Sequence, residues 1–347
     1  MRFGEHSRAA ESERNLTFPG NAPQNRSLRL ATLRKSCLLF VLLLSTFPVA
    51  LAQEVQHAAA GVCSACIRKN LDYLAGPELR GRGSGTIDEY HAAQFIAGEL
   101  KKYGLSPAAE HGEYIQTATI TSSTGRISHT WNVLAKIDGT TEKQQIILLS
   151  AHLDHLGVKN GQVYPGADDD GSGTVAVMEL ARALATEPRP RRTVVFALWG
   201  SEELGLVGAR YFLQHPTFAL HDIVANLEFE MIGRADPKVK PDQLWLTGWQ
   251  RTNLGPELAA HGAQLVGDPH PEQNFFRRSD NYALARDGII AQTVSSYGLH
   301  KDYHQPTDTL DRIDWQHLDS AIASMIAPVT WLANNDFVPR WNAGEKP

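Results

Sequence analysis

Residues 144–153, QQIILLSAHL, form a continuous apolar run that is typical of a β-strand buried on both faces of a sheet. Two more such runs follow along the chain, RRTVVFALWG at 191–200 and IVANLEFEMIG at 223–233. The segments between them have helical character, DGSGTVAVMELARALAT at 170–186 and ELGLVGARYFLQH at 203–215. This alternation predicts an α/β domain in which helices cover both faces of a largely parallel sheet.

The flanking segments extend this pattern in both directions. Residues 87–104 carry apolar side chains near helical spacing, which predicts an amphipathic helix. Residues 113–123 and 128–139 alternate well enough to predict an antiparallel pair of strands. Two further strands and a long helix are expected downstream, at 242–248, at 288–296 and from Trp315 to about Asn334. Because no repeat or interdomain linker interrupts the pattern, we expect a single α/β/α sandwich with a mixed, mostly parallel central sheet.

The first 52 residues are predicted to be a leader, and residues 53–347 the folded domain. A polar stretch with seven basic residues precedes the apolar run LLFVLLLSTF and the small-residue site at 50–52. That order is typical of a secretory signal peptide. The apolar run is shorter than the ~20 residues of a bilayer span, although an uncleaved anchor is the alternative. We therefore expect an exported protein, periplasmic or extracellular, without stable membrane association after cleavage.

Composition and charge exclude several classes of protein. Hydrophobic residues make up 42% of the chain and charged residues 20%, which is an ordinary globular mixture and not that of a collagen or coiled coil. The 33 Lys and Arg are outnumbered by 38 Asp and Glu, so the chain offers no basic field to a nucleic acid. No nucleic-acid partner is expected, and the oligomeric state stays open.

Two cysteines, Cys63 and Cys66, lie in the predicted domain within a helical stretch at 61–76. An exported protein meets an oxidising compartment, so a short-range disulfide or a pair of free thiols is expected. A redox motif needs a preceding thioredoxin-like strand, and a zinc knuckle needs a second pair of ligands. The sequence has neither, so the pair is not expected to carry chemistry.

Side chains that can bind a metal follow four of the apolar runs, where the predicted strands end. They are His152, Asp154 and His155, then Glu202 and Glu203, then Glu230, and lastly Tyr303 and His304. A glycine-flanked acidic loop, GADDDGSG at 166–173, lies between the first and second of these groups. One such residue alone is more often a solvated loop residue. Because the carboxyl ends of parallel strands share one edge of a sheet, their joint placement favours a functional site.

The spacing of these residues points to a divalent metal. Side chains two apart on an extended backbone point the same way, so Asp154 could accept the second N–H of a metal-binding His152. Glu202 and Glu203 are adjacent and diverge, so one could bind metal while the other faces the substrate as a free base. Together with the three aspartates at 168–170, these carboxylates are costly to bury unless a cation compensates them.

Five motifs resemble the metal-site motifs of the M28 family of metallopeptidases, in the order that the family has. They are HLD at 152–154, GADDDGSG at 166–173, SEELG at 201–205, EMIG at 230–233 and HQPTD at 304–308. The stretch LDYLAGPELRGRGSGT at 71–86 also resembles that family, so the likeness covers most of residues 65–335. Too few residues precede the catalytic strand for the family's protease-associated insert. The resemblance implies a zinc aminopeptidase-like fold.

The resemblance also implies two zinc ions per chain. Carried over residue by residue, it implies five ligands: His152 and Glu230 for one zinc, Glu203 and His304 for the other, and Asp169 as the bridge. Asp169 takes this role because it lies three residues before Ser172, and the family joins this aspartate to the next residue by a cis peptide. Many family aminopeptidases have Asp at the position of Glu230, and Glu228, on the same strand face, competes with it.

The resemblance implies hydrolysis of the N-terminal peptide bond of a peptide by a metal-bridging hydroxide, with Glu202 as general base. Tyr303 resembles the tyrosine that some members direct at the oxyanion, although a buried structural tyrosine is the alternative. Capping or supporting roles are expected for Asp280 and Asp308. His155 is expected to be a loop histidine rather than a ligand.

The substrate is less closely defined than the metal site. Tyr297, Tyr282, Phe275 and Phe276 could line an apolar pocket or simply pack. Arg277, paired with Arg278, could bind a substrate carboxylate, as a carboxypeptidase or dipeptidase needs, or be solvated. Glutaminyl cyclisation also occurs on this fold, but it resembles a one-zinc site. A catalytically inactive binding protein is the alternative from another class, and such relatives lose ligands that this chain keeps.

Overall fold

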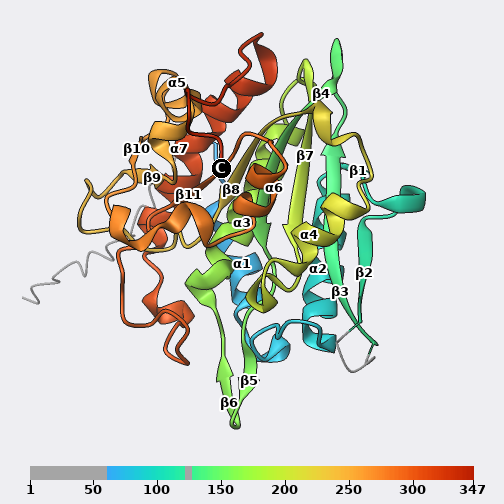
Figure 1. Ribbon diagram of the computed structural model, residues 1–347. Helices are drawn as coiled ribbons and strands as arrows, with labels where there is room; N and C mark the ends of the chain where they lie inside the picture. Colours follow the sequence, from blue (N-terminus) through green and yellow to red (C-terminus); the bar gives the residue numbers. More distant parts are fainter. Residues whose placement is uncertain (1–60, 122–126) are drawn as a thin grey trace, which may run out of the picture. The chain divides into compact units, whose positions relative to one another are not determined.

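The computed structural model describes residues 61–121 and 127–347, which form one α/β unit (Figure 1). The predicted leader at 1–52 lies outside these residues. Within the described residues, nine strands form one sheet in the order β1-β3-β7-β4-β8-β11-β9-β10, with β2 paired to β3. The strands are β1 (Ser106–Pro107), β2 (Ile115–Thr121), β3 (Ile127–Ile137), β4 (Glu142–His152), β7 (Arg192–Trp199), β8 (Ile223–Phe229), β9 (Leu244–Leu246), β10 (Leu265–Gly267) and β11 (Ala291–Ser295).

Parallel pairing is concentrated in the middle of the sheet. There, β4 runs parallel to both β7 and β8, and β8 runs parallel to β11. On one side, β3 pairs antiparallel with β7 and with β2, as predicted for the latter pair. On the other side, β9 is antiparallel to β11, and β10 is parallel to β9. The prediction of a mixed sheet is confirmed, with its parallel part confined to the four central strands and the β9–β10 pair.

Helices cover both faces of this sheet. They are α1 (Ser64–Leu74), α2 (Ile87–Lys102), α3 (Gly173–Ala185), α4 (Val207–Gln214), α5 (Leu254–Ala260), α6 (Asn281–Arg286) and α7 (Trp315–Asn334). The long helix has the bounds predicted for it, and Asp314 caps its first turn by accepting from the His317 N–H at 3.0 Å. The predicted helix at 203–215 begins later, at Val207, because Leu206 just before it has a left-handed backbone with φ 60°.

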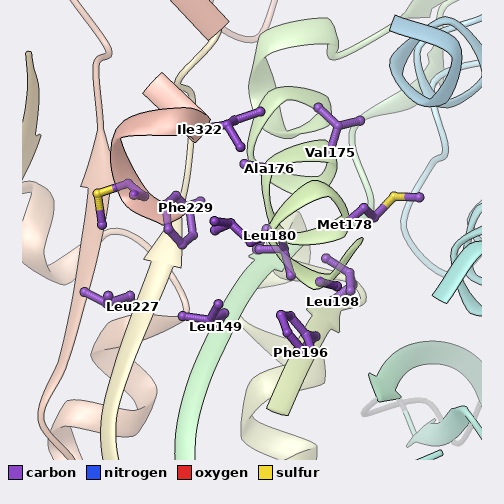
Figure 2. Close-up of a cluster of buried hydrophobic side chains, with 14 of the residues drawn as sticks. Leu149, Val175, Ala176, Met178, Leu180, Phe196, Leu198, Leu227, Phe229 and Ile322 are labelled. Atoms are coloured by element: carbon purple, nitrogen blue, oxygen red, sulfur yellow. The ribbon is translucent and has the colours of Figure 1, made fainter. Parts of the chain in front are cut away.

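The core divides into two layers because successive residues of a strand face opposite sides. Ile147, Leu149 and Ala151 of β4 belong to the cluster that contains α1, α2, α3 and α7. Ile146 and Leu148 belong to the cluster under α4 and α6. Figure 2 shows the first layer, where Leu180 of α3 packs over strand residues such as Leu149 and Phe196, all fully buried. This packing places the ends of β4, β7 and β8 side by side.

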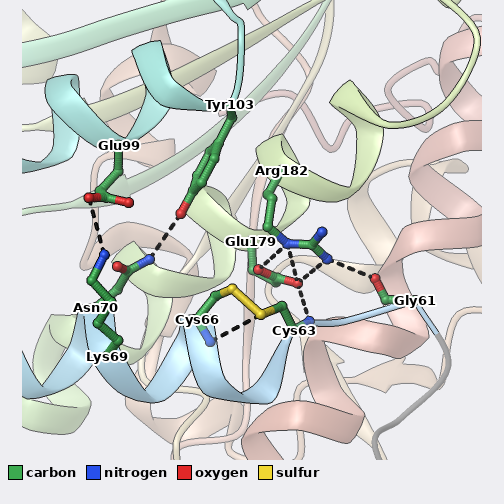
Figure 3. Close-up of a disulfide and its surroundings, with 9 residues drawn as sticks. All are labelled: Gly61, Cys63, Cys66, Lys69, Asn70, Glu99, Tyr103, Glu179 and Arg182. Atoms are coloured by element: carbon green, nitrogen blue, oxygen red, sulfur yellow. Dashed lines mark hydrogen bonds and ion pairs between the residues drawn. A yellow bond between two sulfur atoms is a disulfide. The ribbon is translucent and has the colours of Figure 1, made fainter.

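Two smaller features complete the fold. A two-stranded hairpin of β5 (Gly157–Lys159) and β6 (Gln162–Tyr164), not predicted above, extends at the bottom of Figure 1. Cys63 and Cys66 form a disulfide at the start of α1, which settles the choice left open between a disulfide and free thiols. Figure 3 shows Glu179 of α3 beside it, accepting from the Cys63 N–H and from Arg182.

Across 61–121 and 127–347, no helix has the length and apolar character needed to cross a bilayer.

Candidate metal centre

The carboxyl ends of the central strands bring the predicted site residues together. His152 is the last residue of β4, and Glu230 comes directly after β8. Glu202 and Glu203 form a short helical turn after β7, and His304 lies in the loop that follows β11. Because β7, β4, β8 and β11 are parallel neighbours, these residues meet at one edge of the sheet, as predicted.

His152, Asp169 and Glu230 form a first cluster, in which one potential ligand atom from each residue lies within 4.8 Å of the others. The Nε2 of His152 lies 3.3 Å from Oδ1 of Asp169. His152 and Asp169 are buried, and Glu230 is partly exposed. The structure thus groups the three residues that the family resemblance assigned to the first zinc.

Glu203 and His304 form a second cluster around the other oxygen of Asp169. The Nε2 of His304 lies 3.2 Å from Oδ2 of Asp169 and 3.2 Å from Oε2 of Glu203. His155 also lies here, with its Nδ1 2.9 Å from Oε1 of Glu203 and a fully buried side chain. The sequence analysis expected a loop histidine here, but the structure places the His155 ring beside Glu203 and Asp169. Its position three residues after His152, just past a strand end, was the available signal.

The loop that carries Asp169 is held in place from several sides. The Asp169–Asp170 peptide bond is cis, as the resemblance implied. The carboxylate of Asp308 accepts from the backbone N–H groups of Asp168 and Asp169, and from Arg234. Asp170 accepts from the Met231 N–H at 3.0 Å. Asp168 and Asp170 lie outside the two clusters, and Asp308 supports the loop as expected.

Asp154 supports the site in a different way from the one predicted. Its Oδ1 lies 3.7 Å from Nδ1 of His152, which is too long for a hydrogen bond. That oxygen instead accepts from the Glu202 N–H at 2.9 Å, and Oδ2 accepts from the Ser84 hydroxyl at 2.5 Å. Asp154 therefore positions the 202–204 turn, and with it both glutamates.

Glu228 and Glu230, the two competing carboxylates, have different partners in the structure. Glu228 is fully buried and accepts from the Ser279 and Thr293 hydroxyls and from the N–H groups of Asp280 and Asn281. It thereby anchors the start of α6. Glu230 is the member of the pair that lies with His152 and Asp169. Asp280 is also buried, but neither of its oxygens has a hydrogen-bond partner among the described residues, so the predicted cap is not formed.

The electrostatics of the clusters fit the binding of cations. Burial and the charge of Glu228 raise the pKa of Glu230 to about 8. Burial alone would raise the pKa of Glu203, yet the contacts with His155 and His304 hold it at about 2. Burial lowers the pKa of His304, but Asp169 and Glu203 bring it to about 9. The His304 imidazole thus partly takes the place of a positive charge that the carboxylates require.

Unpartnered polar atoms give a geometric test of metal binding. Among the described residues, both ring nitrogens of His152 and of His155, Oδ2 of Asp169 and Oε1 of Glu203 are buried without a hydrogen bond. Buried polar atoms are rarely left unpaired, because each costs about 1 to 3 kcal/mol. Imidazole nitrogen and carboxylate oxygen are the ligands that zinc takes alongside thiolate. These residues therefore fit a pair of divalent metal ions.

The carboxyl group of Glu202 lies beside the clusters without joining either. Burial raises its pKa, and the charges of Asp280, Glu230 and Glu203 add to the effect of burial. Within the part of the chain that the structure describes, no donor forms a hydrogen bond with this carboxyl group. The group is therefore available to exchange a proton with a bound molecule.

A small cavity, partly open to solvent, adjoins the first cluster through Glu230. Tyr297 and Tyr303 line it as tilted neighbours with ring centroids 5.3 Å apart, and Phe275 stacks on Trp245 at 5.3 Å. Arg278 also lines it and donates to the Tyr303 hydroxyl at 3.4 Å. We refer to this space as the aromatic cavity.

Three residues singled out in the sequence lie away from the aromatic cavity. The guanidinium of Arg277 lies 5.6 Å from the ring centroid of Tyr282, and Tyr282 lines a separate groove together with Arg286. Phe276 packs in the core layer under α4 and α6. The structure thus places Arg278 rather than Arg277 beside the metal centre. Adjacent residues of a short helical turn point in different directions, which the sequence could not resolve.

Buried Arg82 was not identified as a site residue. Its guanidinium donates to the carbonyls of Leu153 and Gly166, which flank the first histidine and the acidic loop. It also donates to the carbonyls of Leu74 and Pro165. It lies in the glycine-rich stretch at 81–85, which was noted only for its family likeness.

Comparisons with known proteins agree with this geometry. A model described as "Peptidase family M28" matches residues 132–329. The "Probable lipoprotein aminopeptidase LpqL" of Mycobacterium tuberculosis is 30% identical over 213 residues, which are 53% of this chain and 41% of that protein. "Leucine aminopeptidase 2" of Arthroderma otae is 26% identical over 66% of this chain and 50% of its own length. The chain thus spans about half or less of the length of these curated relatives.

Solved structures share the fold. An aminopeptidase from Aneurinibacillus sp. strain AM-1 superposes with a TM-score of 0.61 at 16% identity, covering 81% of this chain and 96% of that one. Porphyromonas gingivalis glutaminyl cyclase superposes equally well, with a TM-score of 0.61 at 17% identity, covering 78% of this chain and 99% of that one. At such low identity these two similarities show only the fold, which both kinds of enzyme share.

Proposed function

The chain belongs to peptidase family M28, and from this premise we propose that it is a di-zinc exopeptidase that removes the first residue from peptides. The observation that carries the proposal is the position of Asp169 between the two clusters. Its Oδ1 faces His152 at 3.3 Å and its Oδ2 faces His304 at 3.2 Å. One carboxylate shared in this way is the arrangement that two-metal hydrolases use.

The ligand assignment follows from the two clusters. His152 and Glu230 would hold one zinc, Glu203 and His304 would hold the other, and Asp169 would bridge them. When bound, the metal pair would supply a Lewis acid for the substrate carbonyl and lower the pKa of water at the site. Asp154 would hold the turn at 202–204 so that Glu203 and Glu202 keep their different directions.

Glu202 would act as the general base. Its raised pKa suits a group that takes a proton from water and then delivers it to the departing amine. Tyr303, at the border of the aromatic cavity, would donate a hydrogen bond to the oxygen of the carbonyl under attack. Burial raises the pKa of its hydroxyl, with the charges of Asp169 and Glu230 adding to this, so the donor stays protonated.

The aromatic cavity would take the side chain of the first substrate residue. Tyr297, Phe275 and Trp245 give it apolar walls, which favour an aliphatic or aromatic side chain. Arg278 is already engaged with the Tyr303 hydroxyl, and its guanidinium lies 4.9 Å above the ring of Phe275. These contacts support aminopeptidase over carboxypeptidase action, since a carboxylate would have to compete for this arginine.

We place the enzyme outside the cytosol. The leader-like segment at 1–52 and the Cys63–Cys66 disulfide support export, because disulfides persist in oxidising compartments.

Zinc analysis of the purified chain is expected to give two equivalents, and the absence of bound zinc would contradict the metal assignment.

The activity is tested with matched peptides that carry a free or an acetylated N-terminus. The zinc-loaded protein is expected to release the first residue from the free-amine peptide and to leave the acetylated one intact. Glu202→Gln is expected to keep both zinc ions while turnover falls by about 10²- to 10⁴-fold. Removal of the last residue from both peptides would instead show a carboxypeptidase, and unchanged turnover in Glu202→Gln would exclude Glu202 as the base.

A further inference from the structure

His155 is held rigidly inside the second cluster. Its side chain is fully buried, and its backbone N–H donates to the Arg82 carbonyl at 3.1 Å. The imidazole lies against Gly166, where an added Cβ would come within 2.4 Å of the ring. Gly166 also has φ +60°, a conformation that side-chain-bearing residues rarely adopt. The ring therefore has one orientation, fixed by the backbone on either side of it.

That orientation directs Nδ1 at the same space that Glu203 and Asp169 face. Nδ1 lies 2.9 Å from Oε1 of Glu203 and 3.9 Å from Oδ2 of Asp169. Despite the short first distance, neither Nδ1 nor Oε1 takes part in a hydrogen bond within the described residues. The two atoms are close but not aligned with each other.

The same combination of closeness and misalignment occurs at the proposed ligands. The Nε2 of His152 lies 3.3 Å from Oδ1 of Asp169, and it too has no hydrogen-bond partner among the described residues. Zinc ligands lie about 2.0 to 2.2 Å from the metal, so neighbouring ligands around one ion are roughly 3 Å apart. Their lone pairs point at the shared ion rather than at each other. Contacts of this kind therefore mark atoms that converge on a third.

From these contacts we infer that Nδ1 of His155 is a fourth protein ligand of the second metal ion, together with Glu203, His304 and Asp169. The inference rests on the proposed two-metal function and adds a ligand to its second site. The first site, with His152, Glu230 and Asp169, has three protein ligands. The two sites consequently differ in strength, and the second retains its metal when chelator removes the first.

His155→Asn separates a ligand from a mere hydrogen-bond donor. The asparagine amide nitrogen can occupy the place of Nδ1 and can donate to Glu203, but it binds zinc poorly. We expect the wild-type protein to bind two zinc ions and His155→Asn to lose the second, with affinity there weakened by more than 100-fold. His221→Asn, at a side chain that is 88% exposed, is the matched control and is expected to keep both ions.

A second variant gives a direct spectroscopic readout, which also covers the case in which His155→Asn fails to fold. In cobalt-loaded His155→Cys, a thiolate bound to the metal adds a near-ultraviolet charge-transfer band. We expect that band, and we expect it to be absent from the wild-type protein and from His221→Cys.

The outcomes separate this inference from the proposed function. Two zinc ions in the wild type, with equal affinity in His155→Asn and no band in cobalt-loaded His155→Cys, would overturn the ligand role of His155 alone. Fewer than two zinc ions in the wild type would instead overturn the two-metal function on which the inference rests.

Discussion

Glu228 and Glu230 lie two residues apart on one strand end, and the structure predicts opposite consequences for their conversion to glutamine. Glu230→Gln is expected to lose the first zinc, because Glu230 belongs to the cluster with His152 and Asp169. Glu228→Gln is expected to keep both zinc ions and to lower the free energy of unfolding. The pair therefore tests which carboxylate binds metal and which one supports the fold.

The size of the Glu228 effect follows from its four donors. A glutamine oxygen can still accept from the Ser279 hydroxyl and the Asp280 N–H, which meet Oε1. On the Oε2 side, the Thr293 hydroxyl can rotate to accept, but the Asn281 N–H cannot and is left facing another donor. A hydrogen bond to a charged group contributes about 1.5 to 3 kcal/mol, and a buried donor without an acceptor costs a similar amount. We expect a loss of about 3 kcal/mol.

In the metal-free protein, the carboxyl group of Glu230 is expected to destabilise the folded state when it loses its proton. Its pKa is raised from 4.5 to about 8, so between these values the folded state binds more protons than the unfolded state. The stability contributed by this group is therefore lost as pH rises through that interval. Because the residue is partly exposed, we expect a loss of about 1 to 2 kcal/mol between pH 6 and pH 8. Glu230→Gln abolishes that part of the pH dependence.

Urea unfolding of chelator-treated protein at both pH values, combined with zinc analysis of the loaded protein, checks both expectations. If Glu228→Gln does not fold, Ser279→Ala removes one of the four donors and is expected to cost about 1.5 to 3 kcal/mol. A Glu228→Gln protein that lost zinc while Glu230→Gln kept two ions would refute the assignment. A Glu230→Gln protein as pH-dependent as the wild type would refute the electrostatic argument.

Three further perturbations test other parts of the structure. Tyr303→Phe is expected to lower kcat by about 10²-fold with zinc content unchanged, because one donor to the reacting oxygen is lost; equal kcat would leave the tyrosine a packing role. Replacing Cys63 and Cys66 by serine opens a short loop and is expected to cost roughly 2 kcal/mol in urea unfolding, and an unchanged midpoint would show that the disulfide contributes little. Leu180→Ala, at a fully buried position, is expected to cost about 2 to 5 kcal/mol, and a smaller loss would mean that the core layer closes over the gap.

The parts of the fold that the sequence predicted are those decided by local pattern. The strand β4 and the helix α7 carry their periodicity and end signals within their own residues. The start of α4 could not be predicted in this way, because Asp154 binds the Glu202 N–H from 48 residues away and keeps the 202–204 turn apart from the helix. The antiparallel pairing of β3 with β7 likewise depends on which strands become neighbours in space.

One local signal was present and not used. Asn160 and Gly161 lie between the short strands β5 and β6, and both have positive φ, at 52° and 77°. An Asn-Gly pair between apolar residues is a strong indication of a hairpin turn. The hairpin was therefore predictable from sequence, unlike the pairings that depend on distant residues.

The candidate site likewise has one part that could be predicted from local sequence and one part that depends on distant residues. Glu230 and His304 follow predicted strands within recognisable motifs, so their convergence could be expected from the parallel order alone. The partners of the bridging loop could not, because Asp308 reaches Asp169 from 139 residues away along the chain. The choice between Glu228 and Glu230 also depended on the distant donors at the start of α6. Sequence motifs thus identified the potential ligands, and long-range hydrogen bonds determined which of the neighbouring candidates lie in the two clusters.

The buried charges link metal binding to folding. Arg82 is a fully buried cation beside the acidic loop, and its guanidinium N–H groups are directed at backbone carbonyls such as those of Leu153 and Gly166. Its charge offsets the carboxylates only at a distance, while Asp169 and Glu203, whose pKa values are lowered, keep their charges inside the clusters. Carboxylates gathered in this way repel one another unless a cation lies between them. A ligand that binds only the folded state stabilises it by about 4 kcal/mol at 1,000 times its Kd. Zinc would therefore act as a part of the fold as well as of the reaction.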